Sequence, residues 1–119
     1  MDEFIYWARK AAAYNLVKCS SGNLSQRIDD QQMLVSGTGS WLESLSAEQV
    51  AVVDSLTGES LNNVQPTGEL PLHLALTRMQ RPGINAVLHF QSEAATTLCC
   101  ADVFRITMLL LKFHCMWVK

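Results

Sequence analysis

The order in which apolar patterns follow one another along the chain is the feature that most limits its fold. Apolar residues recur at helical spacing over residues 3–17. Two short alternating segments then flank Asp29-Asp30, which predicts a β-hairpin, and the Val-rich run 50–53 predicts a buried strand. A second amphipathic helix is predicted over about 69–80, followed by a strand over 84–90. Hairpin strands first and a helix-to-strand crossover later predict a three-layer α/β/α sandwich around a central mixed, largely antiparallel sheet.

Several side chains mark the ends of the predicted helices. Asp2 is expected to cap the first helix and Thr67 the second. Pro71 falls in the first turn of the second helix, where it removes no hydrogen bond. Ser92 is placed to cap a third helix that runs through Cys100. These signals mark the starts of three predicted helices.

The length of the chain predicts one domain. It has 119 residues and a mass of 13.2 kDa, with 49% hydrophobic and 17% charged residues. This composition suits a packed core and argues against disorder, so residues 1–119 are treated as one unit. Residues 102–119 form an atypical tail, because they contain no Gly, Pro or turn signal and show no clear period.

Charge and hydropathy exclude several classes of partner. A formal net charge of -2 provides no basic surface for a nucleic acid or an anionic membrane. The acidic opening Met1-Asp2-Glu3 is unlike a signal peptide, and the apolar stretch 106–111 is too short to span a bilayer. A cytoplasmic protein is therefore expected. No C-x-x-C pair occurs, so reduced cysteines that act as small buried apolar residues are expected: Cys19, Cys99, Cys100 and Cys115.

Two loops have the composition of an anion site. Segment 22–25 (Gly-Asn-Leu-Ser) precedes a predicted strand, and its Gly allows close backbone approach while its Asn amide can donate to a phosphate oxygen. A turn that needs Gly and Asn explains the same segment. Segment 36–40 (Ser-Gly-Thr-Gly-Ser) offers successive N–H groups and hydroxyls but lacks the Lys of a P-loop, and an ordinary loop also fits it.

Two further segments carry titratable side chains. Segment 66–69 (Pro-Thr-Gly-Glu) lies at a predicted helix start, where the dipole favours an anion and Glu69 is either a dipole partner or a base. His89 and Gln91 are expected on one face of a strand, where they could converge on one ligand, although a lone strand His is commonly structural. His73 lies one turn after Glu69 and could touch it, but a structural helix-face His is expected there.

Taken in order, these four motifs resemble the class II aldolase and adducin family over about residues 4–100. The family motifs are a G-N-[LVIF]-S loop, a T/S-x-[ST]-G loop, a P-[ST]-[SG]-E helix start and an H-x-H strand. The resemblance implies a class II aldolase/adducin-like fold, of which this chain is expected to be a truncated N-terminal part. It also implies the residues that bind the substrate phosphate: Gly22, Asn23, Thr38, Gly39, Thr67 and Gly68.

The resemblance assigns chemistry to three more positions. Glu69 matches the catalytic acid/base of the family. His89 matches the first ligand of a divalent metal, expected to be Zn²⁺, while Gln91 stands where the family has a second His. The third family ligand is a His further along the chain. A Gln carboxamide is a poor zinc ligand, so the metal site of this chain is in doubt.

By resemblance, the expected activity is that of a metal-dependent aldehyde-lyase of the L-fuculose-phosphate aldolase type. Such an enzyme cleaves a ketose 1-phosphate to dihydroxyacetone phosphate and an aldehyde. The implied partners are a small phosphorylated sugar and further copies of the chain, since family aldolases are tetramers. A pentulose-phosphate 4-epimerase, a dehydratase, a non-catalytic adducin-like interaction module and an inactive truncated fragment are the alternatives, and the motifs do not separate them.

Overall fold

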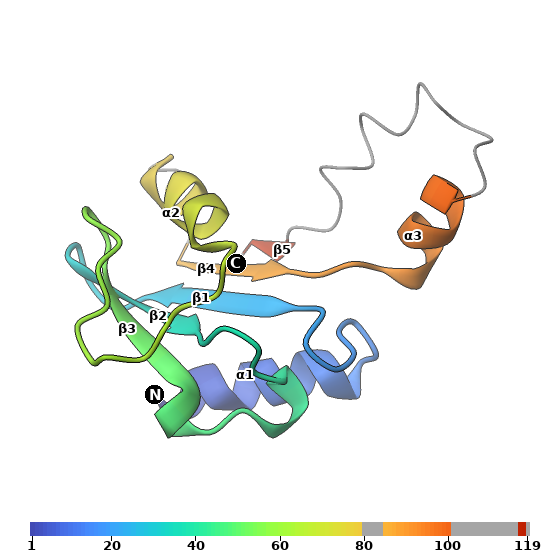
Figure 1. Ribbon diagram of the computed structural model, residues 1–119, viewed down its shortest axis with the longest axis horizontal. Coiled ribbons are helices and arrows are strands. Elements are labelled where there is room, and N and C mark those ends of the chain that lie inside the picture. The colour runs from blue at the N-terminus through green and yellow to red at the C-terminus, as the bar shows by residue number, and fades with distance from the viewer. Residues whose placement is uncertain (80–84, 101–116, 119) are drawn as a thin grey trace.

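A computed structural model describes residues 1–79, 85–100 and 117–118 of the chain (Figure 1). The predicted tail 102–119 lies outside the described residues except for 117–118. The elements are α1 (Asp2–Ala13), β1 (Asn23–Arg27), β2 (Gln32–Ser36), the 3-10 turns η1 (Leu42–Ser44) and η2 (Ala47–Gln49), β3 (Val50–Asp54), α2 (Leu70–Arg78), β4 (Ala86–His89), α3 (Glu93–Cys100) and β5 (Trp117–Val118).

One sheet with the strand order β3-β2-β1-β4-β5 forms the middle of the molecule. β1 lies between β2 and β4, and it pairs Ser25 with Val35 on one side and Asn23 with His89 on the other. The prediction of a mixed sheet needs one correction, because every pairing among the described strands is antiparallel.

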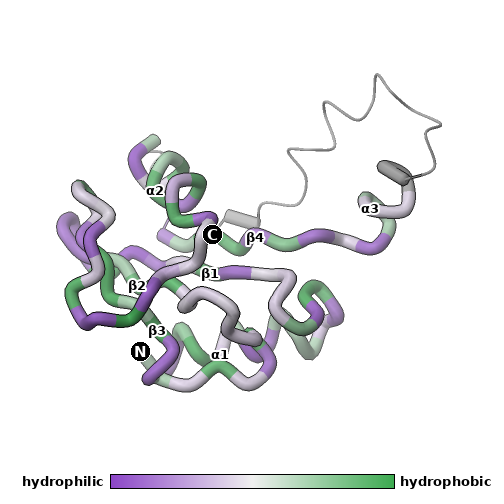
Figure 2. The backbone as a smooth tube through the Cα atoms, in the orientation of Figure 1, coloured by the Kyte–Doolittle hydropathy of each residue, from purple (hydrophilic) through white to green (hydrophobic). Residues whose placement is uncertain are grey.

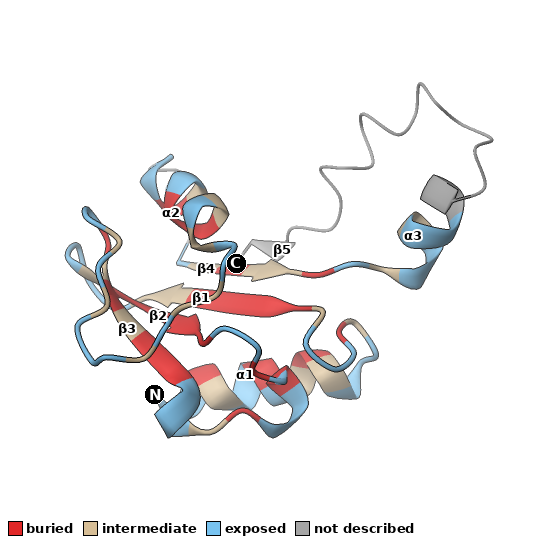
Figure 3. Cartoon of the chain, viewed as in Figure 1, coloured by how far each residue is buried: buried red, intermediate tan, exposed pale blue. Residues whose placement is uncertain are grey.

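Helices cover the two faces of the sheet, α1 on one and α2 on the other (Figure 1). The apolar cluster between α1 and the sheet includes Phe4, Ala8, Leu24, Leu42, Leu45, Val50 and Phe90. The cluster on the α2 face includes Met33, Val35, Ala51, Val53 and Leu74. The buried residues of β2 and β3 divide between the two clusters, so both faces of these strands are covered, and Figures 2 and 3 show the two strands as largely apolar and buried. The predicted three-layer sandwich is therefore confirmed.

Local hydrogen bonds explain the hairpin and the entry into β3. Oδ1 of Asp29 accepts from the backbone N–H groups of Gln31 and Gln32, both at 2.8 Å, and closes the predicted turn between β1 and β2. In η2 the backbone N–H of Ser46 donates to Oε1 of Gln49 at 3.1 Å, which is one half of a capping box.

The first helix differs from its prediction at both ends. Met1 occupies the N-cap position and Asp2 lies inside the first turn, where its charge suits the helix dipole but caps nothing. The helix stops at Ala13 and not at residue 17, because Asn15 has a left-handed φ of 57° and Leu16 N–H turns back to the carbonyl of Ala11.

Of the two other predicted helix caps, one is wrong and one is confirmed. The hydroxyl of Thr67 accepts from the N–H of Glu69 at 3.3 Å, which lies before α2, so Thr67 does not cap that helix. Ser92 does cap α3, because its hydroxyl accepts from the N–H of Ala95 at 3.1 Å. Cys19, expected to be buried, is exposed.

α3 lies at the end of an extended segment that follows β4 and leads away from the sheet (Figure 1). No helix in the described ranges is long and apolar enough to cross a bilayer.

Candidate functional site

Loop 36–40 and segment 65–68 lie side by side. The N–H of Thr38 donates to the carbonyl of Gln65 at 2.9 Å, and the N–H of Thr67 donates to the carbonyl of Ser36 at 3.0 Å. Gly37 and Pro66 form a β-bridge between these two contacts. The second and third motifs of the sequence are therefore joined through their backbones just before α2 begins.

Glycine is required where the two segments meet. A Cβ on Gly37 would lie 2.6 Å from the carbonyl oxygen of Gln49, to which the Gly37 N–H donates at 2.8 Å. Only a residue without a side chain can pass this close to the backbone of η2. Gly37, which was not assigned a role from the sequence, is thus the residue that fixes the position of the loop.

Gly39 and Gly68 leave backbone donors free. Gly39 has a left-handed φ of 69°, and Gly68 has no atom within 4 Å of the place where a Cβ would stand. Within the described part of the chain, neither N–H donates a hydrogen bond. Each of these exposed N–H groups can therefore donate to an anion.

The first motif joins the same region through β1. The backbone N–H of Leu24 donates to the buried hydroxyl of Ser36 at 3.1 Å, so the start of β1 is tied to the start of loop 36–40. Gly22 lies against other atoms here, because a Cβ on it would lie 2.2 Å from Cγ1 of Val17. This close contact explains why the motif begins with glycine.

His73 connects α2 to the polar residues of β1. Its imidazole is 0% exposed, with Nδ1 at 2.7 Å from Oγ of Ser25 and Nε2 at 2.6 Å from Oδ1 of Asn23. Burial, with a smaller effect of nearby His89, lowers the pKa of His73 from 6.5 to about 4, so the ring is neutral near pH 7. Oδ1 is only an acceptor, so Nε2 carries the proton and Nδ1 accepts from the Ser25 hydroxyl.

His73 is a structural residue on a helix face, as predicted, but its partners on β1 were not foreseen. The sequence does contain a pattern that is compatible with the bonds between His73 and β1. His73, Leu74 and Thr77 recur at the spacing of one helix face, and Asn23 and Ser25 share one face of a strand. Which strand face this helix covers follows from the tertiary fold, which periodicity does not contain.

Glu69 lies at the N-cap position of α2 and is exposed. Its carbonyl accepts from the N–H groups of Leu72 at 3.0 Å and His73 at 3.3 Å. Its carboxylate makes no hydrogen bond to another described residue, and it directly follows Gly68 in the chain.

His89 is half-buried at the end of β4, directly across from Asn23. Its Nδ1 is fully buried and has no hydrogen-bond partner among the residues that the structure describes. Such an orphaned nitrogen is compatible with a metal ligand.

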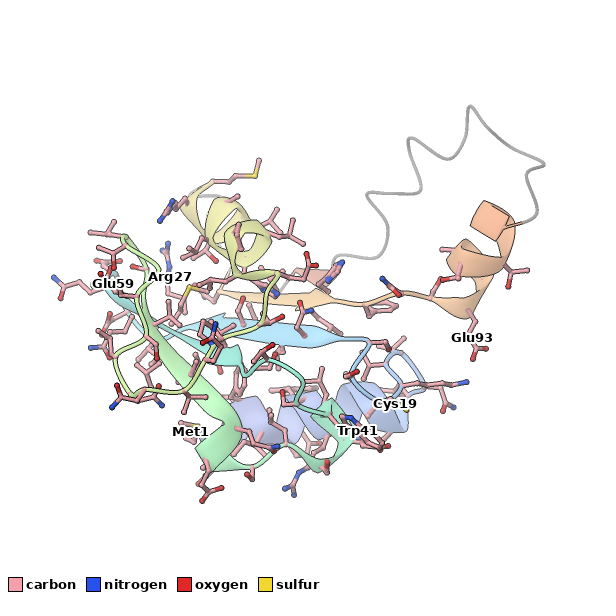
Figure 4. The ribbon with its side chains drawn as sticks, viewed as in Figure 1. Met1, Cys19, Arg27, Trp41, Glu59 and Glu93 are labelled. Carbon is pink, nitrogen blue, oxygen red and sulfur yellow. The ribbon has the colours of Figure 1, made fainter. Side chains whose placement is uncertain are left out.

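The residues around His89 do not complete a metal site. β4 ends at His89, so Gln91 lies beyond the strand. It is exposed and lines an open cavity of about 760 Å³ together with Lys18 and Glu93. These two residues form an ion pair, and Glu93 is the first residue of α3 (Figure 4). Among the described side chains, no three His, Cys, Asp or Glu residues come together as a metal-binding group. These residues alone therefore do not fit a four-coordinate zinc ion.

Comparison with known proteins gives a consistent picture. The Class II Aldolase and Adducin N-terminal domain matches residues 2–118. A 3-oxo-tetronate 4-phosphate decarboxylase of Haemophilus influenzae is 40% identical over 82 residues, which cover 69% of this chain and 38% of that protein. A methylthioribulose-1-phosphate dehydratase of Pectobacterium carotovorum is 39% identical over 79 residues, which cover 66% of this chain and 38% of that protein.

Two solved structures share the fold over most of the described chain. YgbL of Escherichia coli has a TM-score of 0.73 at 31% identity, with 86% of this chain and 48% of that one covered. An L-fuculose 1-phosphate aldolase has a TM-score of 0.70 at 27% identity, with 84% and 47% covered. The chain spans less than half the length of these relatives and about 38% of the curated ones.

Proposed function

Because the chain belongs to the class II aldolase and adducin N-terminal domain family, we propose that it carries the phosphate-binding and proton-transfer residues of a sugar-phosphate lyase. The observation that carries the proposal is the junction of three motifs at the start of α2. There, Gly68, whose N–H has no partner in the described chain, directly precedes the exposed Glu69, and Gly39 lies in the loop whose backbone is bonded to segment 65–67. A phosphate ester bound at the N–H groups would bring its carbon chain toward the Glu69 carboxylate.

The proposed phosphate site uses donors from each motif. The N–H groups of Gly39 and Gly68 and the hydroxyls of Thr38 and Thr67 serve as donors, and Asn23 contributes its side-chain amide. Gly22 acts through shape, since it lets the chain pass Val17 and enter β1 at Asn23.

Glu69 is the proposed acid/base. An exposed carboxylate at a helix start that makes no hydrogen bond within the described chain can take a proton from a substrate and return it at another atom. Members of this superfamily generally use a divalent metal ion. We propose Zn²⁺ as the ion and His89 as one of its ligands. We assign no ligand role to Gln91. Because the described residues do not complete a site, no reaction step is assigned to the metal.

The relatives suggest three candidate reactions, which we test in order of sequence identity. Decarboxylation of 3-oxo-tetronate 4-phosphate comes first, because proteins of that name are up to 40% identical to this chain. Dehydration of methylthioribulose 1-phosphate follows at 39% identity, and cleavage of L-fuculose 1-phosphate follows at 27% identity over the fold. Family members act on sugar phosphates and are generally oligomeric, so a homo-oligomer is part of the proposal.

The test is turnover of these three compounds by the purified chain with added Zn²⁺ or Mn²⁺. Product release is compared between the chain and a Glu69→Gln variant. Glu59→Gln serves as the control, because Glu59 is also exposed but lies on the turn after β3 (Figure 4). Loss of one positioned acid/base is expected to lower kcat by about a hundredfold or more in Glu69→Gln and to leave Glu59→Gln unchanged.

Two results would count against the proposal. Equal turnover in Glu69→Gln and the parent chain would remove Glu69 from the chemistry. If no compound reacts and inorganic phosphate also fails to bind, the chain is not the phosphate-binding part of a lyase. Binding of phosphate without turnover would favour an interaction module that has kept the anion site.

A further inference from the structure

The Asn23 amide has two chemically different ends, and only one is engaged. Its Oδ1 lies 2.6 Å from Nε2 of His73. Its Nδ2 donates no hydrogen bond within the described part of the chain, and it is not among the fully buried polar atoms without a partner. The donor end of this side chain is therefore not engaged by any described residue, and a donor is what an anion requires.

The orientation of this amide is set by a directed series of hydrogen bonds. Ser25 and His73 are 1% and 0% exposed, so no solvent replaces their contacts. A neutral imidazole has one N–H, and with that proton on Nε2 it donates to Oδ1 of Asn23. Nδ1 must then accept, so the Ser25 hydroxyl donates to it at 2.7 Å.

We propose that His73 is a positioning residue that turns the Asn23 amide so that Nδ2, and not Oδ1, faces the bound phosphate. With the ring proton on Nε2, a reversed amide would place Nδ2 against that proton and turn Oδ1 toward the anion, so both ends would be repelled. Ser25 supports this arrangement as the partner of Nδ1, to which its hydroxyl donates when the ring proton is on Nε2. This inference rests on the proposed function, because it takes Asn23 as a phosphate ligand.

Variants at His73 separate positioning from packing. His73→Leu keeps an apolar volume but removes the donor to Asn23. His73→Gln places an amide N–H₂ near the position of Nε2 and can restore that donor. Thr77→Val is the matched control, because Thr77 is also buried on α2 and its hydroxyl bonds only the carbonyl of His73, at 2.8 Å.

The readout is the Kd of inorganic phosphate at pH 7.5, measured by calorimetry on the purified chain. Loss of one charge-assisted hydrogen bond is expected to raise Kd about tenfold in Asn23→Ala and in His73→Leu. Kd is expected to stay within about threefold of the parent value in His73→Gln and to be unchanged in Thr77→Val. The double variant Asn23→Ala with His73→Leu should bind no more weakly than Asn23→Ala alone, because His73 acts through Asn23.

A measurement on the unmodified chain guards against variants that fail to fold. Nitrogen chemical shifts of the His73 ring should identify the neutral tautomer with its proton on Nε2, and a proton on Nδ1 would overturn the inference. A tenfold loss in Asn23→Ala without any loss in His73→Leu would also overturn it, while the proposed phosphate site would stand. If Asn23→Ala leaves Kd unchanged, the phosphate role of Asn23 fails, and the inference fails with it.

Discussion

His73 is a basic side chain in surroundings that disfavour its charged form. It lies between a helix and a sheet, where both ring nitrogens have partners and water has no access. Its residue type and position are plain in the sequence, yet its partners belong to β1, 48 and 50 residues earlier. The proposed loop residues, such as Thr38 and Gly68, follow from the resemblance of their short motifs to the family pattern. The partners of His73 could not be predicted in this way, because they depend on how α2 docks.

The lowered pKa of His73 predicts acid sensitivity. Between pH 6.5 and pH 4 the unfolded chain binds a proton at this position that the folded chain excludes. The free energy of unfolding should therefore fall by about 3 kcal/mol as pH drops through this range, and the contribution should be complete above pH 6.5.

Urea denaturation at pH 7.5, 5.5 and 4.5 measures this effect, with His73→Gln as the reference for all other titrating groups. The difference between the two proteins should shrink toward acid pH. Parallel curves for the two proteins would mean that His73 is protonated as easily when folded as when unfolded.

A methyl group added at Gly37 tests the crowded junction of the two loops. The neighbour at 2.6 Å is a backbone carbonyl of Gln49, which cannot rotate away as a side chain could. Gly37→Ala should lower the free energy of unfolding by about 2 kcal/mol or more. Gly68→Ala is the control, because its Cβ enters open space, and thermal denaturation of both variants should show a loss only in the first.

At the scale of single elements, local hydrogen bonds decided which predictions held. The β1–β2 hairpin was predicted from Asp29-Asp30, and the Asp29 carboxylate closes that turn. The length of α1 was predicted from apolar spacing, which continues to Leu16, but the backbone of Asn15 is left-handed and ends the helix earlier. Spacing records which side chains can be buried, and it carries little information on the backbone angle of one polar residue.

The hairpin turn offers a test of this local control. Asp29→Ala removes the acceptor of two backbone hydrogen bonds at 2.8 Å, and the free energy of unfolding should fall by about 1 kcal/mol. Asp30→Ala makes a matched control, because Asp30 contributes only its backbone carbonyl, to Ser55. Urea midpoints that are equal for the two variants would show that the Asp29 side chain does not hold the turn.

At the scale of the whole molecule, the sequence predicted the layers but not all strand directions. Buried positions on both faces of β2 and β3 require cover on both sides, which α1 and α2 provide. The antiparallel direction of β4 depends on the end of the sheet at which α2 delivers the chain, and no apolar period encodes that. The same holds for Gln91, whose place beyond the end of β4 could not be foreseen from its spacing to His89.

The central place of β1 has a consequence for the folding pathway. Its pairing with β2 closes a short loop, whereas its pairing with β4 brings together residues as distant as Asn23 and His89. Because long-range closure is slow, the β1–β2–β3 meander should gain protection in pulsed hydrogen exchange before β4 does, and simultaneous protection would contradict this order. Asn23 and Ser25 would then be ordered before His73 and His89 pack against β1. The proposed anion site would therefore be among the last parts of the molecule to form.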